Sequence, residues 1–161
     1  MKVRDIMTAP ALTCAPETSV AVAARRMKTA DYGSLPVVDR NGQLVGIVTD
    51  RDMCLALADT TRNALNIAVR EAMTPKVRFV RLDDDAHDAL AMMKHARIRR
   101  LPVCDHDGRL QGMLSIEDVV VRGLEAGGIT IHEIVDALRG MYVRTPAAVE
   151  PLAVEHAPTP G

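Results

Sequence analysis

The pattern of apolar and polar positions along the chain occurs twice. LPVVDRNGQLVG begins at Leu35, and LPVCDHDGRLQG begins 66 residues later, at Leu101. The same offset places VRDIMT at Val3 over VREAMT at Val69, and the register holds without a gap from Val3 to about Met53. Self-similarity over so long a stretch predicts a tandem repeat of one supersecondary unit.

Each unit contains a stripe of apolar residues with the spacing of an amphipathic helix that faces a core. Residues at i, i+3, i+4 and i+7 are Val20, Ala23, Ala24 and Met27 in the first unit, and Ala86, Ala89, Leu90 and Met93 in the second. Thr18 precedes the first helix, and Asp83 to Asp85 precede the second. Hydroxyl and carboxylate groups are favoured there because they satisfy free backbone N–H groups and the helix dipole.

Two short strands around a tight turn follow each predicted helix. LPVV and LPVC are typical of buried strands, and LVGIV and LQGML are the strands after them. Asn41-Gly42 and Asp107-Gly108 separate the strands, and these dipeptides favour tight turns. Helical periodicity returns after Thr49 and after Ser115. With a short strand before its first helix, each unit is predicted to be β-α-β-β-α.

A unit of about 50 residues is marginal as an independent core. We therefore expect two units packed about a pseudo-twofold axis in a mixed α/β (α+β) fold, followed by a C-terminal helix. Thr130 and Glu133 form a capping-box pattern that opens this helix, at roughly 131–141. The expected divisions are a first repeat at 1–59, a linker at 60–68, a second repeat at 69–126, a helical extension at 127–144 and a disordered tail at 145–161.

Composition argues against a nucleic-acid-binding protein. The 161 residues carry a formal net charge of −1, so no global positive field attracts a polyanion. Tyr32, Phe79 and Tyr142 are the only aromatic residues, which are too few for a platform that stacks bases.

Cysteine usage and hydropathy predict a cytoplasmic protein that does not enter a membrane. Cys14, Cys54 and Cys104 are odd in number and widely spaced, which does not indicate a disulfide framework. The N-terminus has no apolar core of signal-peptide length, and no apolar run reaches the roughly 18 residues of a membrane span.

The chemistry-bearing motif is also doubled. GIVTDRD runs from Gly46 to Asp52, and GMLSIED runs from Gly112 to Asp118. One interpretation is helix capping, with Thr49 or Ser115 as the N-cap and an aspartate three residues later. A second role is compatible with the first, since a helix N-terminus binds anions, its hydroxyl can bond a phosphate oxygen, and the carboxylate can accept both hydroxyl protons of a ribose diol.

Taken together, the repeat resembles the cystathionine beta-synthase (CBS) domain, present as a tandem pair or Bateman module. The matching residues are Met7-Thr8 and Met73-Thr74, Leu35-Pro36-Val37 and Leu101-Pro102-Val103, and the two G-x-x-[ST]-x-x-D motifs. The resemblance covers Val3 to about Leu124 and extends to small stand-alone bacterial CBS-pair proteins. It implies intertwined β-α-β-β-α units and a sensor of adenosine-containing ligands.

The resemblance also implies that each cleft draws on both repeats. The first, here called the Asp52 cleft, would combine Thr49, Asp52, Thr74, Phe79, Ile98, Arg99, Arg100 and Pro102. The second, here called the Asp118 cleft, would combine Ser115, Asp118, Thr8, Thr13, Tyr32, Gly33, Ser34 and Pro36.

The two clefts are expected to differ because Arg99-Arg100 stands where the first repeat has Gly33-Ser34. Arginine matches phosphate geometry, which favours a phosphorylated adenosine nucleotide (AMP, ADP or ATP) in the Asp52 cleft. The alternative is a solvated basic edge. Phe79 is either a core residue or a stacking partner for a purine. The Asp118 cleft would take adenosine, a weaker nucleotide, or nothing.

Two functions of different class remain open. The first is a non-catalytic regulatory module that transmits nucleotide occupancy to an effector protein, with no required cofactor. The second is a ligand-independent protein-interaction module with vestigial clefts. No P-loop, G-x-G-x-x-G or G-x-S-x-G motif indicates an enzyme, and no histidine–cysteine clustering indicates a metal site. The family resemblance further implies a homodimer.

Overall fold

Two three-stranded sheets form the centre of the molecule, one for each repeat. The computed structural model describes residues 1–143; the predicted tail at 145–161 and residue 144 lie outside the described residues. The first repeat contains α2 (Val20–Ala30), β1 (Ser34–Val38), β2 (Leu44–Thr49) and α3 (Asp50–Ala58). The second contains β4 (Val80–Arg81), α5 (Ala86–Ala96), β5 (Arg100–Cys104), β6 (Leu110–Ser115), the short α6 (Ile116–Asp118) and the π-helical η2 (Val119–Gly123).

The caps of α2 and α5 explain where these helices begin and end. The side chains of Ser19 and Asp85, 66 residues apart, accept backbone N–H groups of the first turn. The prediction that Thr18 caps the first helix was wrong, because its hydroxyl accepts the N–H of Ala15 instead. Both helices end on a residue in the left-handed conformation, Asp31 or Arg97.

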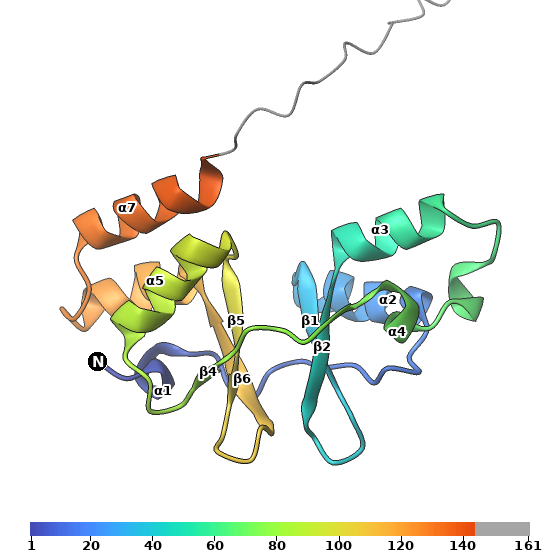
Figure 1. Ribbon diagram of the computed structural model, residues 1–161, viewed down its shortest axis with the longest axis horizontal. Helices are drawn as coiled ribbons and strands as arrows, with labels where there is room; N and C mark the ends of the chain where they lie inside the picture. The colour runs from blue at the N-terminus through green and yellow to red at the C-terminus, as the bar shows by residue number, and fades with distance from the viewer. Residues whose placement is uncertain (144–161) are drawn as a thin grey trace, which may run out of the picture.

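The repeats exchange their N-terminal segments. The short helix α1 (Val3–Ile6) packs in the core of the second repeat, beside α5 and β5. Its counterpart α4 (Val69–Ala72), reached through η1 (Ala64–Asn66), packs in the core of the first repeat. In Figure 1 the chain therefore crosses between the units twice, once after α1 and once after α4. The two small cores are thereby tied into one domain.

Backbone hydrogen bonds at the exchange follow the pseudo-twofold symmetry. The N–H of Val20 donates to the carbonyl of Ile67 at 2.9 Å, and the N–H of Ala86 donates to the carbonyl of Met1 at 2.9 Å. The hairpin tips also meet, through an isolated bridge between Gln43 and Arg109. These contacts join residues that are far apart in sequence, so they specify how the repeats intertwine.

The C-terminal helix α7 (Ile131–Tyr142) confirms the predicted helix and its Thr130 capping box. It lies along α5, buries Ile134, Ala137 and Met141, and pairs Asp136 with Lys94 at 2.6 Å. The first repeat has no such cover among residues 1–143.

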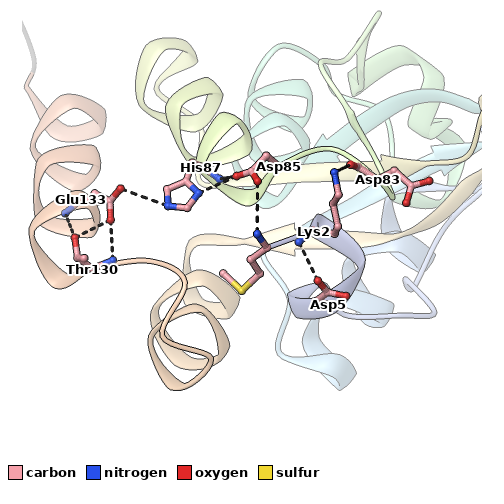
Figure 2. Close-up of polar contacts among 8 residues, drawn as sticks. Lys2, Asp5, Asp83, Asp85, His87, Thr130 and Glu133 are labelled. Atoms are coloured by element: carbon pink, nitrogen blue, oxygen red, sulfur yellow. Dashed lines mark hydrogen bonds and ion pairs between the residues drawn. The ribbon is translucent and has the colours of Figure 1, made fainter.

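Figure 2 shows a chain of polar contacts that ties α7 and the N-terminus to α5. The carboxylate of Asp85 lies 3.5 Å from the N-terminal ammonium group and 2.8 Å from His87 Nδ1. His87 Nε2 lies 3.5 Å from Glu133 Oε1 at the start of α7. Backbone and side-chain hydrogen bonds from His87 lower the pKa of Asp85 to about 2.

None of the described helices has the length and apolar character needed to cross a membrane.

Candidate functional site

Each cleft forms where a Met-Thr segment of one repeat joins the sheet of the other. The strand β3 (Thr74–Pro75) pairs antiparallel with β2, with Thr74 opposite Ile47. Thr8 pairs in the same way with Met113 of β6. The Ser/Thr-Asp motif at the end of the hairpin of one repeat therefore lies near the residues that follow Met-Thr in the other.

The glycine of each motif permits this close approach. A β-carbon at Gly112 would lie 2.6 Å from the carbonyl oxygen of Thr8, and one at Gly46 would lie 2.8 Å from Met73 Sδ and 3.0 Å from the carbonyl oxygen of Thr74. These separations are shorter than van der Waals contact, so glycine lets the segments pair without displacing their neighbours.

Both motifs are capping boxes, as one of the two interpretations predicted. The N–H and hydroxyl groups of Thr49 donate to Asp52 Oδ2 at 2.9 and 2.8 Å, and the N–H of Asp52 donates to Thr49 Oγ1 at 3.1 Å. Ser115 and Asp118 repeat the arrangement at 2.9, 2.6 and 3.1 Å. Each cap uses only one carboxylate oxygen, Oδ2, which leaves Oδ1 as the group that can differ between the clefts.

The Asp118 carboxylate is engaged by its surroundings. The hydroxyl of Thr8 donates to Asp118 Oδ1 at 3.0 Å, and Arg122 Nη1 lies 3.2 Å from the same oxygen. Arg122 also donates to the carbonyl oxygens of Ile6 and Met7 at 2.9 and 2.7 Å, which fixes its position.

The Asp52 carboxylate has no such partners among residues 1–143. The residue 66 positions before Arg122 is Ala56, which cannot donate, and the hydroxyl of Thr74 makes no hydrogen bond to Asp52. Asp52 Oδ1 is therefore available to accept hydroxyl protons from a ligand.

The Asp52 cleft has a volume of about 470 Å³, which falls within the usual range for small-molecule sites. Its walls are Ser34, Ile47, Thr49, Asp52, Thr74, Lys76, Val77, Arg78, Ala96, Ile98, Arg99 and Arg100. Four of these side chains are cationic and one is anionic. The cleft therefore presents a positive surface opposite the α3 N-terminus.

The Asp118 cleft is smaller, at about 360 Å³, and has the opposite balance of charge. Its walls are Thr8, Ala11, Leu12, Asp31, Tyr32, Ser34, Pro36, Arg100, Met113, Ser115, Glu117 and Asp118. Its lining contains three carboxylates and one cation, and Arg122, which pairs with Asp118, lies outside the lining. This balance of charge is less favourable to a phosphate group than that of the Asp52 cleft.

Most of the residues predicted for the clefts are brought together, but four are not. Phe79 and Pro102 lie outside the lining of the Asp52 cleft, and Thr13 and Gly33 lie outside that of the Asp118 cleft. Phe79 is 40% exposed, so the core alternative for this residue was wrong, and the stacking alternative stays a prediction. It directly follows Arg78, which does line the cleft.

The sequence interpretation missed Lys76 and Arg78, two of the four cations. They stand two and four residues after Thr74, at positions occupied by Pro10 and Leu12 in the first repeat. A comparison of charge between the aligned repeats beyond the Met-Thr segment would have found them. Asp31 and Glu117 of the Asp118 cleft were missed in the same way.

The cysteines have no part in either cleft. Cys14 and Cys104 are buried, and desolvation raises the pKa of each thiol to about 11, so both are protonated at neutral pH. Cys104 is the core thiol that its alignment with Val38 predicted. Cys54 is exposed on α3. Within residues 1–143 no group of histidine, cysteine, aspartate and glutamate residues is arranged to hold a metal ion.

Comparison with known sequences gives a match to the CBS domain at residues 3–59 and again at 69–125. An uncharacterized 17.7 kDa protein of Acidianus ambivalens is 31% identical over 145 residues, which cover 90% of this chain and 87% of that protein.

Comparison with solved structures gives CBS pairs that contain adenosine-derived ligands. CBSX2 of Arabidopsis thaliana, solved in complex with AMP, is 32% identical with a TM-score of 0.69, and the match covers 78% of this chain and 98% of CBSX2. The CBS domain pair of protein MJ0100, solved with 5′-methylthioadenosine and S-adenosyl-L-methionine, is 29% identical with a TM-score of 0.68, and the match covers 80% of this chain and 98% of that one.

Proposed function

Because the chain belongs to the CBS domain family, with one domain in each repeat, we propose that it is a non-catalytic regulatory module that binds a phosphorylated adenosine nucleotide in the Asp52 cleft. The observation that carries this proposal is the pairing of an available carboxylate oxygen on Asp52 with four cations on the facing walls. A ribose diol and a phosphate are the two groups that such a site recognises.

The chemistry of the walls favours one arrangement of the ligand. The ribose hydroxyls donate to Asp52, and the phosphate lies at the N-terminus of α3 and against Lys76, Arg78 and Arg99. Ile47, Val77 and Ile98 supply apolar surface for the adenine ring. The AMP complex of CBSX2 supports this choice of ligand class.

The Asp118 cleft is proposed to take an adenosine derivative without a phosphate more readily than a nucleotide. Its carboxylates repel phosphate, and Asp118 Oδ1 already has two partners. The complex of MJ0100 with 5′-methylthioadenosine and S-adenosyl-L-methionine, neither of which carries a phosphate, supports this assignment.

A route for transmission begins at Arg99. This side chain lines the Asp52 cleft, and its Nη1 donates to the hydroxyl of Tyr142 at 3.3 Å, at the end of α7. A phosphate that attracts Arg99 competes with Tyr142 for the guanidinium group. Occupancy of the cleft is thereby linked to the position of α7, which an effector protein can read.

Self-association is proposed through the groove between α2 and α3, which includes Ala21, Ala24, Lys28, Asp31 and Leu57. The corresponding surface of α5 (His87, Leu90 and Lys94) is covered by α7 within the same chain. The first repeat keeps this surface open. A second copy, related by a twofold axis, can match Lys28 with an Asp31 across the interface.

Light scattering tests the dimer. Ala24→Glu places a charge in the groove and is expected to give a monomer, whereas Arg25→Glu on the outer face of α2 is expected to leave a dimer. A concentration-independent monomer for the unmodified chain would rule out this interface.

Isothermal titration tests the ligand site. Purified chain, stripped of bound ligand, is titrated with AMP, ADP, ATP, NADH and S-adenosylmethionine. Saturable binding of an adenine nucleotide that is weakened by Asp52→Ala is expected. If none of them binds, the motifs act only as helix caps, and the ligand-independent interaction module becomes the function to pursue.

A further inference from the structure

Two residues line both clefts, and they are related by the pseudo-twofold axis. Ser34 and Arg100 are 66 positions apart, each opens the first strand of its repeat's hairpin, and each contributes to the wall of the Asp52 cleft and of the Asp118 cleft. If both positions held the same residue type, the two clefts would have equivalent walls here. Here one member is a serine and the other an arginine, so the two clefts share one central cation.

The guanidinium group of Arg100 is held toward acidic side chains. Its Nη2 lies 3.7 Å from Oε1 of Glu117, which belongs to the wall of the Asp118 cleft. On the other side, a β-carbon at Gly33 would lie 3.6 Å from Arg100 Nη1 and 3.5 Å from Asp50 Oδ2. Arg100 thus reduces the negative charge at the mouth of the Asp118 cleft while it remains part of the wall of the Asp52 cleft.

Ser34 cannot take over this role. Its side chain is only 9% exposed, and its Oγ is the one buried side-chain polar atom in residues 1–143 that has no hydrogen-bond partner. A buried hydroxyl without a partner is costly, and it is satisfied when a ligand brings a polar atom to the shared wall. The centre of the domain therefore offers one hydroxyl and one movable cation to two clefts.

We propose that the two clefts compete for Arg100, so that a phosphate in the Asp52 cleft lowers the affinity of the Asp118 cleft for an anion. This inference rests on the proposed function of the Asp52 cleft. When a phosphate attracts Arg100, the contact with Glu117 is lost. Asp31 and Glu117 then face the second cleft without a cation, whereas Asp118 keeps Arg122 as its partner. Because coupling between sites is reciprocal, an anion in the Asp118 cleft weakens phosphate binding in the Asp52 cleft by the same factor.

The coupling can be measured with AMP as the probe. The affinity of the Asp118 cleft is first measured in the Asp52→Ala chain, whose other cleft is disabled. It is then compared with the weaker of the two AMP sites in the unmodified chain, where the Asp52 cleft is already filled. We expect the second value to be weaker by about tenfold, within the usual range of coupling between sites.

Arg100→Ser is the matched variant, because it gives the second repeat the residue that the first repeat has at this position. In this background the affinity of the Asp118 cleft is expected to be the same whether or not the Asp52 cleft is filled. Thermal unfolding of each variant shows whether the domain remains folded. Adenosine, which has no phosphate, serves as the ligand control and is expected to show no coupling in either background.

Three outcomes overturn the proposal. Equal AMP affinity of the Asp118 cleft in the filled and disabled states shows that the clefts are independent. Absence of AMP binding to the Asp52→Ala chain shows that the Asp118 cleft binds no anion, so that no second site competes for Arg100. Coupling that survives Arg100→Ser shows that another group carries it. An AMP isotherm unchanged by Asp52→Ala contradicts the proposed function itself and is thereby distinguished from the other results.

Discussion

The Asp52 and Asp118 clefts have the same backbone and nearly the same motif, yet their surroundings differ in charge. Thr49 and Asp52 form the same capping box as Ser115 and Asp118, with hydrogen bonds that agree to within 0.2 Å. The cleft of the first box is lined by four cations. The cleft of the second is lined by two further carboxylates, Asp31 and Glu117, and Asp118 Oδ1 already has partners. A repeated motif therefore establishes a repeated helix start, whereas residues outside the motif determine the charge of the cleft around each start.

The largest expected effect comes from replacing the first glycine of each motif, where an added β-carbon would collide with the Met-Thr segment of the other repeat. Gly112→Ala places a β-carbon 2.6 Å from a backbone oxygen, whereas Gly46→Ala meets the flexible side chain of Met73 first. We expect Gly112→Ala to lower the free energy of unfolding by about 3 kcal/mol and Gly46→Ala by about 1 kcal/mol, because overpacking costs more against backbone than against a movable side chain.

Urea denaturation measures both values under one set of conditions. Gly42→Ala is not a suitable control. An added β-carbon would meet no neighbour there, but the φ of +78° would itself be strained in alanine. Ala91→Gly on α5 gives instead the scale of a simple helix-propensity change, about 1 kcal/mol. Equal losses for the two motif glycines would contradict the geometry.

The second prediction distinguishes the roles of the Asp52 and Asp118 carboxylates. Asp52→Asn removes the negative oxygen that accepts the ribose hydroxyls and is expected to weaken AMP binding by roughly 2 kcal/mol, about 30-fold. Asp118→Asn should change this site little. It is expected instead to destabilise the fold, since it breaks the contacts of Asp118 with Thr8 and Arg122.

Paired titration and thermal unfolding of the two variants check this separation. The reverse result would be a loss of AMP affinity in Asp118→Asn and a loss of stability in Asp52→Asn. It would show that the nucleotide binds in the Asp118 cleft and would contradict the proposed assignment. Glu125→Gln, which removes an exposed charge that lines neither cleft, is the control for a general effect of net charge.

The third effect concerns the cations that distinguish the walls. Arg78→Leu copies Leu12 of the first repeat and is expected to weaken AMP binding by about fivefold, near 1 kcal/mol, as for a solvent-exposed ion pair. Adenosine binding should not change, because the lost contact is to phosphate. The AMP effect should also shrink as salt is added, since exposed charges are screened.

The smallest effect compares the caps of α2 and α5 at low pH. The pKa of Asp85 is lowered to about 2 by its hydrogen bonds to His87, whereas Ser19, its counterpart in the first repeat, does not titrate. A carboxyl with a depressed pKa in the folded state stabilises the fold above its unfolded value of 3.8, and this contribution is lost as the pH falls toward 2.

Asp85→Ser should therefore flatten the fall in unfolding free energy between about pH 4 and pH 2. The measurement is a series of urea denaturation curves across that range. Asp83→Ser is the control, because it removes a nearby carboxylate that does not cap α5. An identical pH dependence in the Asp85→Ser chain would show that the hydrogen bonds of Figure 2 do not favour the ionised form.

Much of the fold could be predicted from the sequence because it depends on neighbours a few residues apart. The apolar stripes predicted α2 and α5, the Asn-Gly and Asp-Gly turns predicted the hairpins, and Thr130 with Glu133 predicted α7. The exchange of Met-Thr segments was expected only through the family resemblance. No local pattern at Thr8 or Thr74 shows which sheet it joins.

The candidate site could be predicted only in part. Thr49, Asp52, Thr74, Arg99 and Arg100 do share one wall, whereas Phe79 and Pro102 do not, and Lys76 and Arg78 were not foreseen. A side chain next to a predicted strand can face a cleft or solvent, and alternation of strands does not settle the direction where the strand is only two residues long.

The sequence alone determined the repeat, the helices α2, α5 and α7, the two hairpins and the two capping boxes, because these are set by periodicity and by hydrogen bonds between residues a few positions apart. The strand predicted before α2 is only an isolated bridge at Cys14. The tertiary structure decided which carboxylate is engaged, which cations surround the other, and that Arg100 stands in both walls. Thr8 and Asp118, which are 110 positions apart, are brought to 3.0 Å only when the repeats intertwine. Contacts of that separation depend on the packing of the whole domain, and for that reason no local pattern contains them.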